Sequence, residues 1–255
     1  MSHPWRDAAA RAHAFVRARG SPLERLRARA LLGETPASEV TRAFAAAGAL
    51  AAVEPDALLG PLSALDDLRQ LAAPELEPAL RALGAALGPD GAWGDPAEPL
   101  AGRIVRTAHL GGFLTKSLRA RPRVRAAVDG FLCRSWDAER VRGGDFVTLA
   151  AYAHWFSLNE SDVSDAALQW CGRELERGYR TRACDALRAA RVFVLCHAAA
   201  LPGAGLGARE LCEALVGEQT ADGGFALSER ALSGAPVEAA LEALAAWAQL
   251  GKTSG

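Results

Sequence analysis

The chain has 255 residues, half of them hydrophobic, and a formal net charge of −1, so it can bury one sizeable core. The balanced charge argues against a general nucleic-acid binder, because such proteins carry a strong basic excess. No stretch of the sequence is long and apolar enough for a membrane span, and the first residues lack the apolar segment of a secretory signal. We therefore expect a cytoplasmic protein.

The pattern of apolar residues predicts helices throughout. Alanine, leucine, arginine and glutamate, which favour helices, are abundant, and no segment shows the alternation of a half-buried strand. Apolar spacings of three and four residues, interrupted by glycine and proline, predict six helical hairpins at intervals of roughly 40 residues. In chain order, we expect their helices at about 6–19 and 22–32, 38–53 and 56–71, 74–87 and 100–118, 123–134 and 146–158, 161–176 and 183–201, and 208–217 and 237–250.

Three of the breaks between helices share one pattern, a glycine turn followed by an aromatic residue. It is clearest at 219–225 (QTADGGF), recurs at 87–93 (LGPDGAW) and is weaker at 142–146 (RGGDF). A recurring turn of this kind indicates a helical repeat. The terminal helices are as apolar as the middle ones, whereas an open solenoid needs polar ends. We therefore predict a single domain over 1–255, an all-α α6/α6 toroid that forms a closed ring.

The segment Gln219-Thr220-Ala221-Asp222-Gly223-Gly224-Phe225 resembles the repeat motif of the prenyltransferase and squalene–hopene cyclase superfamily, whose members are α6/α6 toroids. The resemblance implies a central cavity that binds a hydrophobic, anion-headed small molecule or a peptide, and a cyclase or transferase reaction in specialised metabolism. The chain lacks the Asp-x-Asp-Asp acid of class II cyclases, for which Ala64-Leu65-Asp66-Asp67 is the nearest segment, and it lacks the Asp-x-Cys zinc ligands of protein prenyltransferases. The alternative is a non-catalytic binding or scaffold subunit that keeps the toroid shape and has a protein partner in a biosynthetic pathway.

A second resemblance concerns zinc. Trp170-Cys171 and Cys196-His197 are similar to the ligand segments of lanthipeptide cyclases, which are also toroids. This implies a third candidate, a zinc-dependent peptide cyclase with Cys171, Cys196 and His197 as ligands. However, Cys196 and His197 lie in the pattern of a buried helix, where adjacent side chains point about 100° apart. Apart from this zinc alternative, we predict no cofactor.

Arginines near the starts of predicted inner helices are candidates for binding an anionic head group. In the related toroids, the helices after the glycine turns are the inner ones, and their N-termini attract anions. Arginine is well suited to gripping a phosphate or carboxylate with two hydrogen bonds. The candidates are Arg103, Arg106, Arg182 and Arg188, together with Asp185. The alternative is an exposed helix face with ordinary surface ion pairs.

Histidines and aromatic residues complete the expected cavity. His109, His154 and His197 fall on three successive predicted inner helices, and a histidine can exchange protons near neutral pH. Tyr152, Trp155 and Phe193 could form an apolar wall on the same helices. The alternative for both sets is that they are ordinary residues of the core.

Overall fold

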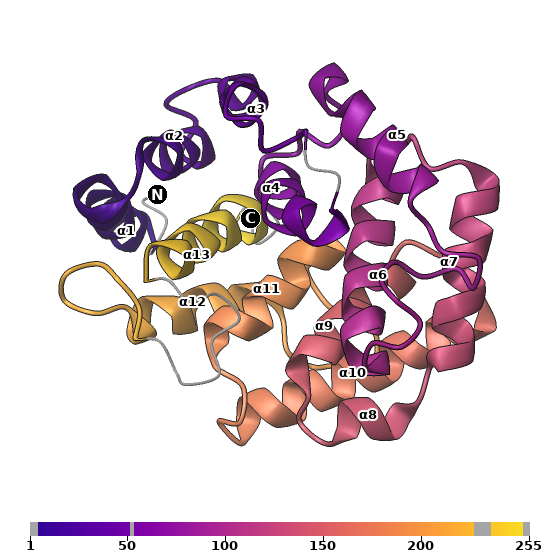
Figure 1. Cartoon of the computed structure of the whole chain (residues 1–255). Helices are drawn as coiled ribbons and strands as arrows, with labels where there is room; N and C mark the ends of the chain where they lie inside the picture. The colour runs from indigo at the N-terminus through magenta and orange to yellow at the C-terminus, as the bar shows by residue number, and fades with distance from the viewer. Residues whose placement is uncertain (1–4, 52–53, 227–235, 252–255) are drawn as a thin grey trace.

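The computed structural model describes residues 5–51, 54–226 and 236–251, and these residues form thirteen α-helices and one short 3₁₀-helix, with no β-strand among them (Figure 1). The protein is therefore all-helical over the described ranges, as the sequence predicted. In chain order the helices are α1 Arg6–Arg19, α2 Pro22–Leu31, α3 Ala37–Ala46, α4 Pro55–Asp67, the 3₁₀-helix η1 Pro74–Leu76, α5 Glu77–Ala85, α6 Leu100–Lys116, α7 Pro122–Ser135, α8 Ala138–Arg142, α9 Phe146–Phe156, α10 Asp162–Arg180, α11 Ala186–Cys196, α12 Ala208–Glu218 and α13 Pro236–Leu250.

Local sequence explains where many of these helices start. Ser21 forms a capping box with Glu24 and precedes a proline at the first position of α2, an arrangement that satisfies N–H groups left free at a helix start. The side chains of Asp145, Ser161 and Asp185 each accept a hydrogen bond from a backbone N–H three residues later, at the starts of α9, α10 and α11.

The packing brings the two ends of the chain together. Helices α1 and α2 both pack against α13, so the first hairpin contacts the last helix (Figure 1). A continuous path of helix contacts closes the arrangement: α2 packs on α3, α3 on α4, α4 on α6, α6 on α9, α9 on α11, and α11 on α13. In α9 all residues but Val147 are buried, and in α11 all but Leu187. The burial of α9 explains why its sequence is apolar on every side.

The glycine turns serve as docking points for neighbouring helices. Gly91, in the turn after α5, has φ +89°, and a Cβ there would lie 2.1 Å from the carbonyl oxygen of Ala127 on α7. Gly223, in the turn after α12, has φ +90°, and its Cβ would lie 2.3 Å from the carbonyl oxygen of Arg11 on α1. Glycine is required at both positions because it alone combines positive φ with such close contact.

The clearest copy of the repeated turn also binds α1 by hydrogen bonds. The side-chain amide of Gln219 donates to the carbonyl oxygen of Ala8 at 2.9 Å, and its oxygen accepts from Arg11 at 3.0 Å. The same amide donates to the carbonyl oxygen of Gly223 at 3.1 Å. Gln219 therefore holds its own turn and the first helix at once.

Some helix boundaries differ from the sequence-based expectation. The helix expected to end at 201 ends at Cys196, because His197 adopts a left-handed conformation with φ +51°. The helix expected over 56–71 ends at Asp67, two residues before Arg69, which has φ +57°. The short helix α8 was not expected. The helix expected over 38–53 ends at Ala46, shortly before Gly48, which has φ +71°, and only residues 52–53 of that range lie outside the described residues.

Candidate functional site

Seven charged side chains meet between helices α2, α4, α6, α11 and α13. Five of them are almost fully buried, with side-chain exposures of 8% or less, whereas two glutamates on α13 remain partly exposed. We call this group the buried charge cluster; it consists of Arg27, Asp66, Asp67, Lys116, Arg191, Glu238 and Glu242.

Asp67, at the end of α4, is the anion of one half of the cluster. Arg191 donates a hydrogen bond to its Oδ1 at 2.5 Å, and the guanidinium of Arg27 lies 3.9 Å from its Oδ2. Arg27 in turn donates two hydrogen bonds to Glu238, at 2.8 and 2.9 Å. Burial raises the pKa of Asp67, and the charges of Arg191 and Arg27 oppose this shift. The result is a chain of alternating charges from α13 through α2 and α4 to α11.

Asp66 is the anion of the other half. Lys116, the last residue of α6, donates to its Oδ2 at 2.6 Å and to the carbonyl oxygen of Leu195 at 2.5 Å. His197 Nε2 lies 3.0 Å from Asp66 Oδ1, and Arg69 contacts the other ring nitrogen. Burial opposes ionisation of Asp66, but the hydrogen bond from His197 and the charge of Lys116 outweigh it and hold the pKa of Asp66 below its usual value.

Glu242, on α13, has a pKa near neutrality. Its nearest cation is Arg191, whose Nε lies 4.0 Å away, and its side chain keeps 14% exposure. Burial raises the pKa of Glu242 to about 7, helped by the nearby carboxylates and opposed by Arg191. The cluster can therefore gain or lose a proton at Glu242 close to physiological pH.

Two of the three predicted histidines form a pair. His109 on α6 and His154 on α9 approach with their Nδ1 atoms 3.1 Å apart, and both rings lie against Phe113. Burial, together with the positive charges of Arg191 and Lys116, lowers the pKa of His109 to about 3, and burial also holds the pKa of His154 well below its usual value. Both rings are therefore neutral at physiological pH. The third predicted histidine, His197, is bonded to Asp66 instead.

The predicted arginines of α6 are engaged by carboxylates. Arg103 is buried, pairs with Asp90 and lies over the ring of Phe131, with the guanidinium carbon 5.2 Å from the ring centroid. Arg106 bonds both Asp56 and Glu98, and these bonds outweigh burial and raise its pKa further.

The predicted charged residues before and within α11 lie at that helix's start. Asp185 is its N-cap and accepts a hydrogen bond from the backbone N–H of Arg188 at 2.8 Å. The side chain of Arg188 is buried, and its Nε lies 3.7 Å from Asp185. Arg182 is exposed and precedes the helix at φ +60°. The four predicted arginines therefore lie at two separate places. Arg103 and Arg106 lie on α6 and bond Asp90, Asp56 and Glu98, whereas Arg182 and Arg188 lie at the start of α11.

The predicted aromatic residues are fully buried side chains. The hydroxyl of Tyr152 donates to the carbonyl oxygen of Ser135 at 2.6 Å, and its ring packs on Trp136 and Phe156. Trp155 donates to Asp129 at 3.2 Å, and Phe193 on α11 has no exposed surface.

The three predicted zinc ligands come from α10 and the end of α11. Burial raises the pKa of the Cys171 thiol, and it raises that of Cys196 to about 11. Within the described part of the chain, no three His, Cys, Asp or Glu side chains come together in a group that could hold a metal ion.

The buried charge cluster was largely missed by reasoning from the sequence. Of its seven members only Asp66 and Asp67 were singled out, for their partial likeness to a cyclase acid, together with His197, which contacts Asp66. A usable signal existed, because Arg191 and Lys116 lie in otherwise apolar stretches, VFVLC after Arg191 and GGFLT before Lys116. Charged residues in such surroundings are rarely buried without a partner.

Comparison with known proteins finds no match. No family model, no curated protein and no solved structure matches it. Across the ranges that the structure describes, none of the helices has the length and apolar character that crossing a bilayer requires.

Proposed function

We propose that the chain is a single-domain α/α toroid of the kind found in the prenyltransferase and terpene-cyclase superfamily, with its last hairpin packed on its first. Two observations support this proposal: α1 and α2 pack against α13, and the turn of Gln219 and Gly223 binds α1. The turn after α5 contacts α7 in the same way. In both cases the turn after one outer helix supports the outer helix of the next hairpin. The turn after α12, in the last hairpin, supports α1 of the first hairpin, as expected for a closed ring.

For its function, we propose a non-catalytic toroid that binds a ligand or partner outside the middle of the ring. The buried charge cluster carries this proposal. Each of its charges lies 4.0 Å or less from an opposite charge within the chain, and its two aspartates are almost completely buried. A catalytic acid or base must reach its substrate, whereas these groups already bind one another.

The physical role of such a cluster is to fix the arrangement of helices. Burying charges costs solvation energy that the ion pairs recover only with good geometry, while removing one partner is strongly destabilising. We propose that Asp66, Asp67 and their partners specify how α2, α4, α6, α11 and α13 meet.

Acid–base catalysis in the middle of the ring is the second candidate. It is favoured by Glu242, which has a pKa of about 7 and keeps part of its side chain accessible. A general acid or base works best with a pKa near the operating pH. Under this alternative, Glu242 exchanges protons with a bound substrate.

A double-mutant cycle tests the structural role of the cluster. We expect Asp67→Asn and Arg191→Gln each to destabilise the fold, with a coupling energy of about 1–3 kcal/mol measured by urea unfolding. A sealed pair is screened little by salt, so the coupling should persist from about 0.1 M to about 1 M salt. A coupling that disappears in high salt would indicate a solvated, open site and would contradict the proposal.

A further inference from the structure

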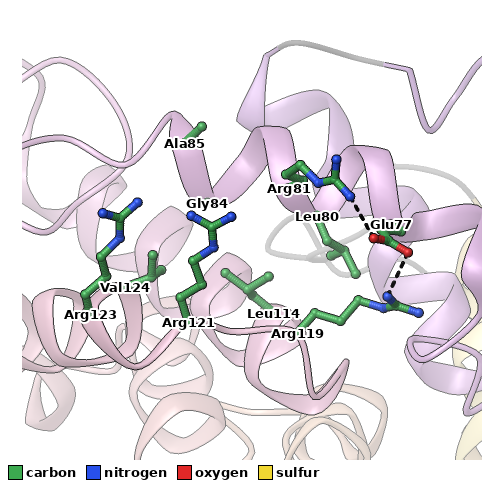
Figure 2. A pocket seen from close by; sticks show the side chains of 10 residues that line it. All are labelled: Glu77, Leu80, Arg81, Gly84, Ala85, Leu114, Arg119, Arg121, Arg123 and Val124. Atoms are coloured by element: carbon green, nitrogen blue, oxygen red, sulfur yellow. Dashed lines mark hydrogen bonds and ion pairs between the residues drawn. The ribbon is translucent and has the colours of Figure 1, made fainter.

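A surface pocket of about 380 Å³ lies between α5, the end of α6 and the start of α7 (Figure 2). Its volume falls within the range of about 300–1,000 Å³ that is typical of small-molecule sites. Leu80 and Val124, both buried, and Leu114 supply its apolar lining, from three different helices. Four arginines and one glutamate also line it: Arg81, Arg119, Arg121, Arg123 and Glu77. We call it the arginine pocket.

The positive charge of the arginine pocket is poorly balanced. Glu77 is shared by two of the arginines, accepting from Arg81 at 2.7 Å and from Arg119 at 3.1 Å (Figure 2). Among the described residues, neither Arg121 nor Arg123 has a side-chain hydrogen bond or an ion pair with a carboxylate. In Figure 2 both extend from the start of α7 in the same direction, toward Gly84 and Ala85.

The sequence around the pocket has the same imbalance. Residues 99–128 contain seven lysines and arginines and no aspartate or glutamate, although the whole chain has a net charge of −1. Of these seven, Arg103, Arg106 and Lys116 pair with carboxylates elsewhere. Of the other four, Arg119, Arg121 and Arg123 line the pocket, whereas Arg125 bonds Asn159 and Leu158.

Helix polarity adds to this excess. Arg121 is the N-cap of α7 and Arg123 lies in its first turn, which contains no acidic residue. The start of a helix carries partial positive charge, so arginines there are unfavourable and an anion is favoured. A bound anion would offset both the mutual repulsion of the arginines and the helix polarity.

We propose that the arginine pocket binds a small organic phosphate with an apolar body. Guanidinium groups bind phosphate oxygens in pairs of hydrogen bonds, and an excess of three positive charges suits a head group with two or more negative charges. The apolar body lies against Leu80, Leu114 and Val124. This inference rests on the proposed binding role and gives it a site and a ligand class.

Isothermal titration calorimetry with phenyl phosphate tests the inference on the full chain. We expect saturable binding that weakens as salt is raised, weaker binding of inorganic phosphate and no binding of phenol. The Arg121→Ala/Arg123→Ala variant should lose at least about tenfold in affinity. Arg209→Ala, at an exposed arginine on α12 outside the pocket, is the matched control and should bind like the wild type.

Three outcomes would overturn the inference. The first is no saturable binding of phenyl phosphate, and the second is equal binding by the wild type and the double variant. The third is sedimentation with phosphatidic acid vesicles without binding of free phenyl phosphate, which would assign the arginines to a lipid surface instead. Circular dichroism confirms that the double variant is folded. The Asp67–Arg191 cycle is independent of this pocket, so failure of the phosphate site and failure of the proposed structural core can be distinguished.

Discussion

The buried charge cluster and the arginine pocket use the same residue types in opposite ways. In the cluster, Arg191 and Lys116 are buried and each bonds an aspartate of the same chain. In the pocket, Arg121 and Arg123 are exposed, and the single glutamate is bonded to the other two arginines. The comparison teaches that a concentration of charge indicates a binding site only when its partners are missing from the chain. Four substitutions test this contrast, taken from the largest expected effect to the smallest.

The first prediction removes one cation of the cluster. Lys116→Met leaves Asp66 buried with His197 as its remaining close partner, and breaking a buried ion pair costs about 3–5 kcal/mol. Urea unfolding followed by circular dichroism measures the loss. Arg209→Met is the control, because its ion pair with Glu213 is exposed on both sides and should be worth less than about 1 kcal/mol. Equal effects of the two substitutions would remove the distinction between cluster and surface.

The second prediction concerns pH. The pKa of Glu242 rises from 4.5 to about 7 on folding, so the unfolded state releases the proton first as pH rises. The contribution of Glu242 to stability is complete below about pH 4.5 and is lost as pH rises through about 7, a change of up to roughly 3 kcal/mol.

Chemical denaturation at a series of pH values measures this loss. Glu242→Gln cannot titrate and should abolish this part of the pH dependence. If the difference in stability between the wild type and Glu242→Gln stays constant from pH 5 to pH 8, burial does not perturb the pKa of Glu242.

The third prediction tests the contact of the last turn with α1, the helix that packs against α2. Gly223→Ala introduces positive φ strain and a contact of 2.3 Å with Arg11, and we expect a loss of about 1–3 kcal/mol. Gly217→Ala is the matched control, because nothing lies within 4 Å of its added methyl group and it lies inside α12. That substitution should stabilise the fold by about 0.4–1 kcal/mol. Thermal unfolding measures the shift in Tm of each variant relative to the wild type. Equal shifts in Tm for the two variants would contradict the packing of the turn on α1.

The fourth prediction is the smallest and has the opposite sign. Arg123→Glu places a negative charge in the first turn of α7 and relieves repulsion among the pocket arginines, so we expect stabilisation by about 0.3–1 kcal/mol. Arg173→Glu, at an exposed position in the middle of α10, controls for the general effect of charge reversal. Destabilisation specific to Arg123→Glu would mean that this arginine has a structural role in the free protein.

The sequence predicted the helical class and most helix positions, because helix formers, capping residues and glycine breaks act locally. Ser21 with Pro22 and the turn at Gly223 are examples. It did not predict the left-handed residue His197, because an apolar stretch surrounds it and nothing marks the end of the helix.

The two sites were harder to predict, for different reasons. The cluster joins residues far apart in sequence, such as Asp67 and Arg191 or Asp66 and Lys116, so no local motif marks it. The arginine pocket does have a local signal, the run of arginines at 119–125 without acidic residues. The sequence-based prediction considered the starts of the expected inner helices, where Arg103 and Arg182 lie, and local sequence does not reveal which arginines find partners.

Phenyl phosphate titration of two variants in parallel tests the contrast between cluster and pocket most directly. The first variant, Asp66→Asn/Lys116→Gln, alters the buried charge cluster without changing its net charge, and the second, Arg121→Ala/Arg123→Ala, alters the arginine pocket. We expect the first to bind like the wild type and the second to lose at least about tenfold in affinity. A folded first variant that loses binding, beside a second variant that retains it, would place the ligand among the buried charges and contradict the account.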